Sequence, residues 1–515
     1  MKLDFAKNTK RNVAADTISR GLALLFPFMN RTLFLRLLGP QFLGLNGLFG
    51  AILGVLSLAE LGFGTAVICS MYKPIAEDDR DLVRAYLRFY RTVYRWVGAI
   101  IFIAGLCLLP FLRNLIHGDL PEGISLHILY LLHLLNTSLS YFLFAYRGSI
   151  LSAHHRNDVL TNLRSVFSII QYLTVFVILM IKGLDPAKKY YCYVIVTVLF
   201  TVAQNVMIMR KSKELFPDIE PRGDLAPERK RHVLSDVKSI FMHKIGMVIS
   251  YQIDNVVISA FLGLGWVATY GNYYYVYTTV AGLPAIIYTS MMGGFGNKIH
   301  TESREKNFEL FMRVNRMVGI ITIWCTAMML ALYQPFVRAW MGGRNPTLVQ
   351  HFLTPALLVL LFYINLSRKV LLTFKGAAGL WREDRWKPIA GGAVKLLTCL
   401  LSVFLLSDKY KLDGVIASSI IGYALVQIPW ESHVMFTCFF DRKCGLSYWH
   451  HQIKFALLAL IPCAATLAAV QAVPFDRTEG LIMKSIIAAA VSIPAMALLF
   501  RKDLVAMTNR LLHND

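Results

Sequence analysis

Charged residues are scarce in this 515-residue chain, where they make up 16% of the sequence, against about 25% in a typical soluble protein. Apolar residues make up 56%, and apolar runs of about 20 residues recur from one end of the chain to the other. As a helix, a run of that length crosses roughly 30 Å of hydrocarbon. This composition excludes a soluble globular enzyme.

Patterns typical of metal, nucleotide and nucleic-acid sites are missing as well. The eight cysteines are scattered without metal or redox spacing, and no glycine-rich loop suggests a phosphate cradle. The formal net charge is +22, but the basic residues lie mostly between the apolar runs and do not cluster on one hydrophilic domain. The short loops on the side with fewer basic residues carry no carboxylate pair and no nucleophile beside a base. We therefore expect no enzyme activity, no cofactor, no metal and no nucleic-acid partner.

The apolar runs predict an all-α polytopic membrane protein of about fourteen transmembrane helices, with two six-helix lobes around a central cavity plus two C-terminal helices. The second of these spans is expected as one helix over residues 42–70. Lys and Arg concentrate in alternate loops, beginning with the N-terminus. By the positive-inside rule both termini then lie in the cytoplasm.

The longest hydrophilic stretch, residues 211–237, contains three prolines and reads as a cytoplasmic linker. It separates an N-lobe over 1–210 from a C-lobe over 238–440. Residues 441–515 then form the two C-terminal helices and a tail.

A faint internal repeat supports this division. Leu38-Gly39 follows the first predicted span, and Leu262-Gly263 follows the seventh. Six spans per lobe is an even number, so the lobes would be related by an axis along the membrane normal.

Polar residues inside the first span are the strongest functional signal. Asp16, Arg20, Pro27 and Arg31 fall within about 60° of one another on a helix that advances 100° per residue. An arginine at mid-membrane costs at least about 2.5 kcal/mol, so this face should look into protein or water. Pro27 removes a helix hydrogen bond and is expected to act as a hinge. Arg20 could instead pair with Asp16, and Arg31 could snorkel to the membrane surface.

Other intramembrane charges lie in later spans. Glu60 in the second span is a candidate partner for Arg31. Lys244 and Asp254 lie ten residues apart in the seventh span, too far to pair with each other. Lys395 in the eleventh span is the candidate partner for Asp254. Lys484, near a span end, is expected to snorkel.

Tyrosines mark one face of the eighth predicted span. Tyr270, Tyr274 and Tyr277 share that face and could stack on sugar rings. An interfacial aromatic belt would give a similar pattern, and the sequence leaves both open.

Several motifs in order resemble those of the bacterial polysaccharide repeat-unit flippases (Wzx type) of the multidrug/oligosaccharidyl-lipid/polysaccharide exporter superfamily. The resemblance covers about residues 10–445 and is carried by these motifs: Leu43-Gly44-Leu45-Asn46-Gly47-Leu48-Phe49, Leu58-Ala59-Glu60-Leu61-Gly62-Phe63-Gly64, Tyr72-Lys73-Pro74, His243-Lys244-Ile245-Gly246, Asp254-Asn255, Ile258-Ser259, Gln334-Pro335-Phe336 and Trp381-Arg382-Glu383-Asp384-Arg385-Trp386-Lys387-Pro388.

The resemblance implies alternating access, by rocking between inward-open and outward-open states, in the bacterial cytoplasmic membrane. The implied cargo is a polyprenyl-diphosphate (undecaprenyl-type) oligosaccharide for capsule, exopolysaccharide or a similar surface glycan. A polysaccharide polymerase of the same pathway is an expected partner, alongside membrane lipids, and the protein is expected to be a monomer.

Charge favours the same cargo, because arginine can fork two oxygens of a diphosphate. We therefore expect Arg20, Arg31 and Lys244 to bind it, with Asp16, Glu60, Asp254 and Lys395 as gating or coupling charges. The coupling force stays open among the membrane potential, H⁺ and Na⁺. Lys395 counts against Na⁺, because a sodium site needs oxygen ligands. The alternatives are a drug or metabolite antiporter of the same fold and a membrane-embedded polysaccharide polymerase or ligase.

Overall fold

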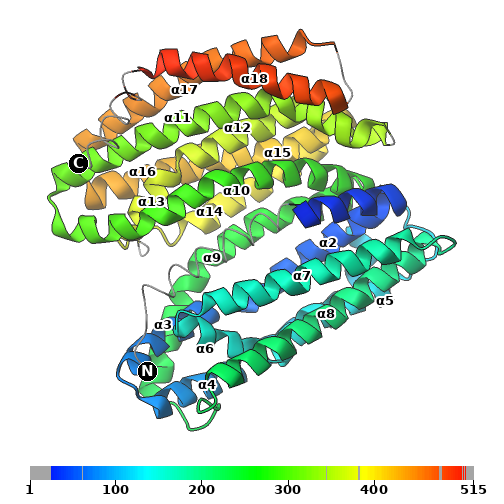
Figure 1. Ribbon diagram of the computed structural model, residues 1–515, viewed down its shortest axis with the longest axis vertical. Helices are drawn as coiled ribbons and strands as arrows, with labels where there is room; N and C mark the ends of the chain where they lie inside the picture. The colour runs from blue at the N-terminus through cyan, green and yellow to red at the C-terminus, as the bar shows by residue number, and fades with distance from the viewer. Residues whose placement is uncertain are drawn as a thin grey trace. The chain divides into compact units, whose positions relative to one another are not determined.

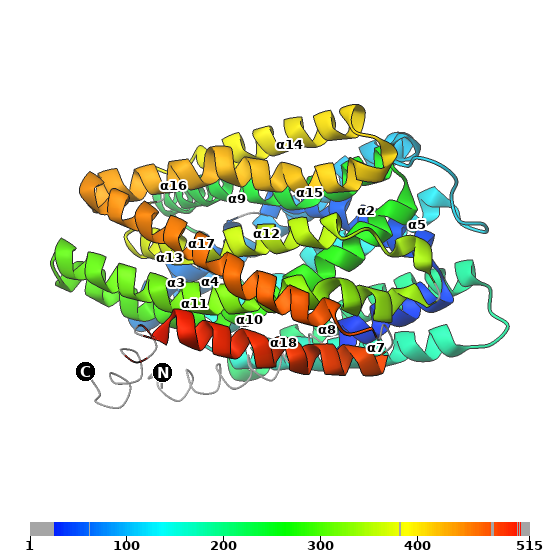
Figure 2. The same cartoon turned by 90° about the horizontal axis from the view of Figure 1, so that it is seen from above.

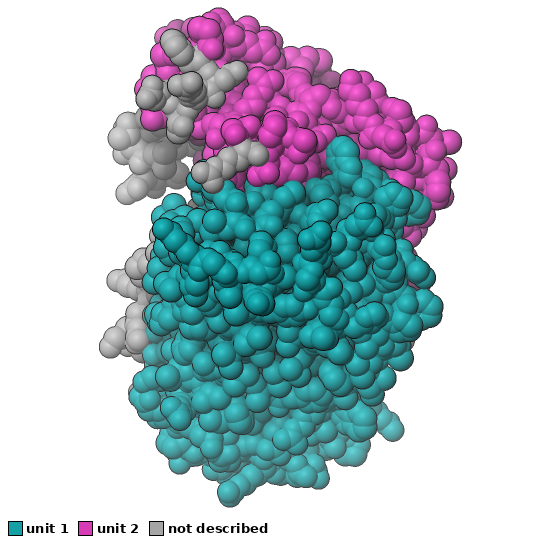
Figure 3. All heavy atoms as spheres, turned by 90° about the vertical axis from the view of Figure 1, so that its right-hand side faces the viewer, with its two compact units in different colours: residues 1–268 teal, residues 269–515 magenta. Residues whose placement is uncertain are grey.

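A computed structural model describes residues 25–60, 62–343, 345–380, 383–474 and 478–501, with 503 and 505. Within the helices that run from 227 to 301, the backbone is described but some side chains are not. The described chain consists of helices joined by turns and loops, without a strand in those ranges. By its contacts it divides into two compact units, residues 1–268 and 269–515, which are coloured separately in Figure 3.

Unit 1 contains a helix over residues 25–37 and a set of packed helices after it (Figure 1). These are α2 (Pro40–Leu56), α3 (Phe63–Ala76), α4 (Arg80–Leu108), α5 (Leu126–Phe142), α6 (Gly148–Ala153), α7 (Asn157–Met180), α8 (Pro186–Leu215) and α9 (Pro227–Phe261). α5 packs on α4 and α8, α7 packs on α8, and α9 packs on α2 and α3. The packing of α9 explains why the division by contacts falls after residue 268. The four-part division expected from the sequence stays a prediction.

Unit 2 takes in most of α10 and all later helices. They are α10 (Leu264–Thr301), α11 (Arg304–Val337), α12 (Leu353–Ser367), α13 (Lys369–Ala377), α14 (Lys387–Leu405), α15 (Lys411–Gly422), α16 (Ile428–Val434), α17 (Arg442–Gln471) and α18 (Thr478–Leu499). α14 runs beside α15 (Figure 2), and α17 and α18 pack on α11 and on each other. Lys484 on α18 is only 5% exposed, so protein encloses it and the expectation of snorkelling was wrong.

The helices confirm an all-α membrane protein. Nine helices in the described ranges are long and apolar enough to cross a membrane, or ten if the bent pair Leu126–Phe142 and Ala145–Ala153 counts as one span. Fourteen spans stays a prediction.

The second predicted span is broken, contrary to the single helix expected over 42–70. α2 ends at Leu56, a 3₁₀ turn covers Ser57–Glu60, and α3 starts at Phe63. Gly62 has φ 99°, a left-handed conformation that suits glycine because it has no Cβ. The break places Glu60 between two helix ends.

The internal repeat is visible in the backbone at both of its turns. Gly39 precedes α2 with φ 98°, and Gly263 precedes α10 with φ 100°. The helices that follow approach each other closely, since a Cβ on Gly44 would lie 1.9 Å from the carbonyl oxygen of Leu264. A Cβ on Gly47 would lie 3.1 Å from Val267 Cγ1. Glycine on α2 therefore permits a backbone-to-backbone contact at the two repeat turns.

Candidate functional site

Glu60 at the break between α2 and α3 is the best-defined intramembrane carboxylate in unit 1. The hydroxyl of Tyr94 on α4 donates a hydrogen bond to its Oε1. The hydroxyl of Tyr141 on α5 donates to Oε2 over 2.8 Å. Both carboxylate oxygens therefore accept hydrogen bonds from phenols. The pairing with Arg31 stays a prediction.

The tyrosines reach Glu60 because α4 and α3 approach closely. Tyr90 and Tyr94 lie one turn apart on α4, with their ring centroids 4.3 Å apart. A Cβ on Gly64 of α3 would lie 3.0 Å from the Tyr90 hydroxyl, so glycine there leaves room for the ring. Phenol donors can hold a carboxylate in place without neutralising it, which leaves its charge available to a cation, a proton or a cargo hydroxyl.

The remaining predicted charges are placed only in part. Asp16 and Arg20 lie outside the described residues. Pro27 and Arg31 lie in the helix over 25–37 and are half-buried. The backbone of Lys244 belongs to α9, but its side chain lies outside what the structure describes.

Asp254 and Lys395 are both buried, as expected for charges inside a membrane protein. Asp254 lies on α9 in unit 1, and Lys395 lies on α14 in unit 2. Their pairing stays a proposal.

The three tyrosines of the eighth predicted span do share one face of α10. Ring centroids lie 5.3 Å apart for Tyr270 and Tyr274, and 5.1 Å apart for Tyr274 and Tyr277. The amide of Asn365 donates to the Tyr277 hydroxyl over 2.7 Å. Tyr270 and Tyr277 are buried, which counts against an interfacial belt, and sugar contact stays a prediction.

Sequence reasoning missed a set of buried charges in unit 2. Glu431 on α16 is fully buried and bound by Arg368 and Lys387. Both cations lie at the ends of apolar runs, where the sequence alone indicates contact with water, but the structure buries them. The available signal was Glu431 itself, which is the only Asp, Glu, Lys or Arg in residues 414–440 of the sequence.

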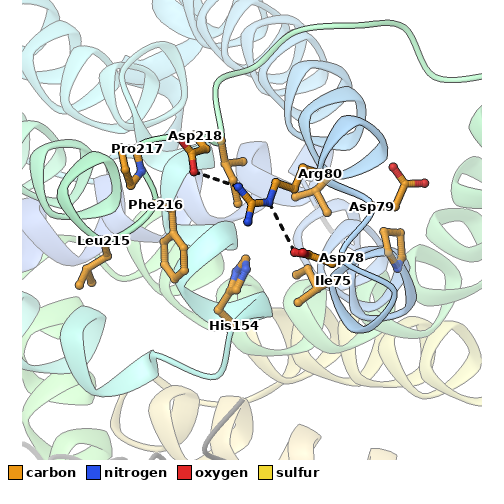
Figure 4. Close-up of a pocket in the computed structure, with 12 residues that line it drawn as sticks. Ile75, Asp78, Asp79, Arg80, His154, Leu215, Phe216, Pro217 and Asp218 are labelled. Atoms are coloured by element: carbon orange, nitrogen blue, oxygen red, sulfur yellow. Dashed lines mark hydrogen bonds and ion pairs between the residues drawn. The ribbon is translucent and has the colours of Figure 1, made fainter. Parts of the chain in front are cut away.

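The linker expected over 211–237 divides into the end of α8, a loop and the start of α9. In the loop, Asp218 accepts hydrogen bonds from two arginines of α4. Arg80 Nη1 lies 3.0 Å from Asp218 Oδ2, and Arg84 Nε donates to the carbonyl oxygen of Asp218 over 2.8 Å. Figure 4 shows Arg80 between Asp218 and Asp78 at the rim of a small pocket, with Phe216 facing His154 inside it.

A second anchor of the loop is buried. Arg147 donates to the carbonyl oxygen of Ile219 over 2.9 Å and to Glu220 Oε2 over 2.7 Å. Burial opposes the charge of Glu220, but Arg147 and Lys213 outweigh it and hold the pKa of Glu220 below its ordinary 4.5. The loop is therefore fixed to unit 1 by charge-assisted hydrogen bonds.

Comparisons with known proteins agree with this architecture. The sequence model of a family described as polysaccharide biosynthesis protein matches residues 9–292. A search of curated protein sequences gives no significant match.

Several solved structures share the fold at low sequence identity. The lipid II flippase MurJ, in an inward closed conformation, aligns with a TM-score of 0.65 and 17% identity over 96% of this chain and 99% of that one. An inward-facing multidrug resistance MATE family transporter of the MOP superfamily gives 0.60 and 13% over 81% and 96%. A MOP superfamily transporter from Pyrococcus furiosus, described as having a binding pocket of reverse polarity, gives 0.55 and 15% over 84% and 96%. These three solved structures are of a flippase and two transporters.

Proposed function

Because the chain belongs to the polysaccharide biosynthesis protein family, we propose that it is a flippase for a polyprenyl-diphosphate-linked oligosaccharide. It moves this cargo from the inner to the outer leaflet of the bacterial cytoplasmic membrane, for the assembly of capsule, exopolysaccharide or a similar surface glycan. Both termini lie in the cytoplasm. The main observation in support of this proposal is the family match, which spans residues 9–292 and so includes every proposed diphosphate ligand.

The fold supports transport of a lipid-linked cargo. A lipid II flippase aligns over nearly the whole length of both chains. In this proposal the sugar head enters a central cavity while the lipid tail stays in the bilayer, and alternating access changes the side to which that cavity opens.

Arg20, Arg31 and Lys244 are assigned to the diphosphate, since a cation-rich face suits two phosphates and arginine can bind two oxygens at once. Asp16, Asp254 and Lys395 are assigned to gating or coupling, together with Glu60, whose two tyrosine donors keep the carboxylate in one place. Pro27 is assigned as the hinge of the first helix.

A drug or metabolite antiporter is the second candidate, since a multidrug resistance transporter shares the fold. Cationic drugs require acidic cavity residues. Among the charged residues assigned above, the basic ones outnumber the acidic ones. The proposed cargo therefore fits the charges better.

The test is binding of a short-chain polyprenyl diphosphate to purified protein. Arg20→Ala should nearly abolish binding and transport. Arg20→Lys should weaken them in part, because lysine keeps the positive charge but cannot bind two oxygens at once as a guanidinium does. Yield and melting temperature control for folding. Wild-type affinity in well-folded Arg20→Ala refutes the assignment of Arg20. Native mass spectrometry with retained lipids tests the cargo itself, and a bound drug in place of a lipid-linked glycan would favour the antiporter.

A further inference from the structure

One face of the first half of α4 carries a row of five arginines. Their spacings of four, four, three and four residues place them within about 80° of one another on a helix that advances 100° per residue. We call this set the arginine row, and its members are Arg80, Arg84, Arg88, Arg91 and Arg95. The only acidic residue of α4 is Asp81, which pairs with Arg84. The helix therefore cannot balance the row by itself.

The first three members of the row hold the loop that leads into α9. Arg80 and Arg84 bind Asp218, as described above. Arg88 Nη1 donates a hydrogen bond to the carbonyl oxygen of Gly223 over 3.0 Å. Neither of the last two arginines makes a hydrogen bond or an ion pair with another described residue. The row therefore changes its surroundings after its third member.

The uncharged segment that follows the row indicates its depth in the membrane. The helical segment Arg80–Leu115 is long and apolar enough to span a bilayer. Its 17 residues 96–112 contain no Asp, Glu, Lys or Arg. Arg95 and Arg113 flank this stretch and lie about 27 Å apart along a helix, close to the roughly 30 Å thickness of the hydrocarbon. Each of these two arginines therefore lies near an edge of the hydrocarbon when the segment spans it.

The exposed side chains change character at the same level. Trp96 is 68% exposed and Ile103 is 60% exposed, which is expected of apolar side chains that face lipid. Tryptophan is enriched at the level of the lipid headgroups. Arg95, directly before Trp96, is exposed as well. The boundary between headgroups and hydrocarbon on this face of α4 therefore falls at Arg95 and Trp96.

The headgroup layer is deep enough for two members of the row. It extends about 5–8 Å beyond the hydrocarbon on each side. Arg91 is half-buried and lies one turn from Arg95, about 6 Å farther from the hydrocarbon. Arg88 lies about 10 Å from Arg95 along the axis, beyond the layer, where it binds the loop. Only Arg91 and Arg95 of the arginine row therefore lie at the depth of the lipid phosphates.

The chemistry at this depth favours a lipid with a net negative charge. A guanidinium stays charged and can bind two phosphate oxygens at once. A zwitterionic lipid carries its own ammonium group, which balances its phosphate. An anionic lipid lacks that internal balance, so basic residues at the membrane surface attract it.

We propose that Arg91, Arg95 and Trp96 form a binding site for an anionic phospholipid of the surrounding bilayer. The two guanidiniums bind its phosphate, and the indole of Trp96 packs on its glycerol and the first methylene groups. The arginine row then joins the loop before α9 to the bilayer through one helix. The inference requires only that α4 spans a membrane, so it does not depend on the proposed flippase function.

The test is quenching of Trp96 fluorescence in the full-length protein reconstituted into lipid vesicles. One preparation contains phosphatidylcholine with a small fraction of phosphatidylglycerol brominated on its acyl chains. The other has the same lipid composition, but the same mole fraction of bromine is on the phosphatidylcholine. Subtracting the signal of Trp96→Phe isolates Trp96 from the other tryptophans. One basic residue at an anionic surface corresponds to about a fivefold preference, so two predict an enrichment of up to roughly 30-fold. Brominated phosphatidylglycerol should therefore quench Trp96 several-fold more strongly.

The matched variants remove two arginines each. Arg91→Gln with Arg95→Gln should abolish the excess quenching by phosphatidylglycerol. The control is Arg229→Gln with Arg231→Gln, which removes the same charge from exposed residues at the start of α9 and should keep the excess. Each variant is also made with Trp96→Phe for the subtraction, and melting temperature controls for folding.

Salt tests the same contact without an arginine substitution. Raising the ionic strength from 0.1 M to 1 M shortens the Debye length from about 10 Å to about 3 Å. The excess quenching in the wild-type protein should therefore shrink, which decides the question if the Arg91 and Arg95 variant is not recovered folded. Equal quenching by the two brominated lipids in wild type would show arginines that are only solvated and overturns the proposal. An excess that survives the Arg91 and Arg95 substitutions, or is lost equally in the control, overturns it as well.

Discussion

Gly44→Ala tests the close contact between the two repeat turns. The new Cβ would lie 1.9 Å from the carbonyl oxygen of Leu264, with the carbonyl carbon at 2.6 Å. Both atoms are backbone, so no side chain can rotate away, and the helix starts must separate by more than about 1 Å. Overpacking of this kind costs about 1–3 kcal/mol. Alanine in place of glycine within a helix gains up to about 1 kcal/mol in propensity, which only partly offsets that cost.

The matched control is Gly50→Ala on the same helix, where a Cβ would meet no atom within 4 Å. Gly50→Ala should gain only the stability that comes from the higher helix propensity of alanine. The difference between the variants should therefore be about 1–3 kcal/mol, or roughly a 5- to 150-fold change in the population with the contact formed.

The assay is disulfide formation between cysteines at positions 47 and 267, in a background without the eight native cysteines. A Cβ at position 47 lies 3.1 Å from Val267 Cγ1, so the pair should oxidise readily while the contact is intact. Gly44→Ala should slow oxidation and lower the melting temperature relative to Gly50→Ala. Equal oxidation rates and equal melting in the two variants would refute the reasoning.

Three further predictions concern coupling, linker docking and topology. Neutralising either Asp254 or Lys395 alone should impair transport more than neutralising both, because a lone buried charge is worse than none; additive losses in the double variant would contradict the pairing. Arg147→Ala should cost about 1–3 kcal/mol of stability, with the part from Glu220 reduced by that side chain's partial exposure. Since the folded pKa of Glu220 is lowered, its contribution to stability is present above about pH 4.5 and is lost as the pH falls through the folded pKa. Urea unfolding at pH 7 and pH 3.5 should therefore show a smaller loss of stability on acidification in Arg147→Ala than in wild type. Equal losses would refute the pairing of Arg147 with Glu220. A single cysteine replacing Gly118 should react with an impermeant thiol reagent in intact cells, and labelling only after lysis would reverse the predicted topology.

The fold was predictable because membrane burial imposes long apolar runs that hydropathy detects directly. The break at Gly62 was not predicted, because the residues on both sides of it are apolar and read as one continuous span. The contacts of Glu60 were missed for a different reason. Tyr94 and Tyr141 lie 34 and 81 residues away along the chain, and only tertiary packing brings them to the carboxylate.

The cations of unit 2 show the limit of counting charges in loops. Arg368 and Lys387 lie at the ends of apolar segments, where the sequence alone indicates contact with water. Their burial depends on Glu431, which enters from α16 more than forty residues later in the chain. Hydropathy along the chain contains no information about this partner.

The packing of α9 has a consequence for biosynthesis. Its partners α2 and α3 precede it in the sequence, as do the arginines that hold the loop leading into it. When α9 leaves the ribosome, the two helices on which it packs have therefore already been translated. Domains fold as units during synthesis, with the N-terminal part first. The first 268 residues can accordingly assemble in the membrane while α11 to α18 are still being translated.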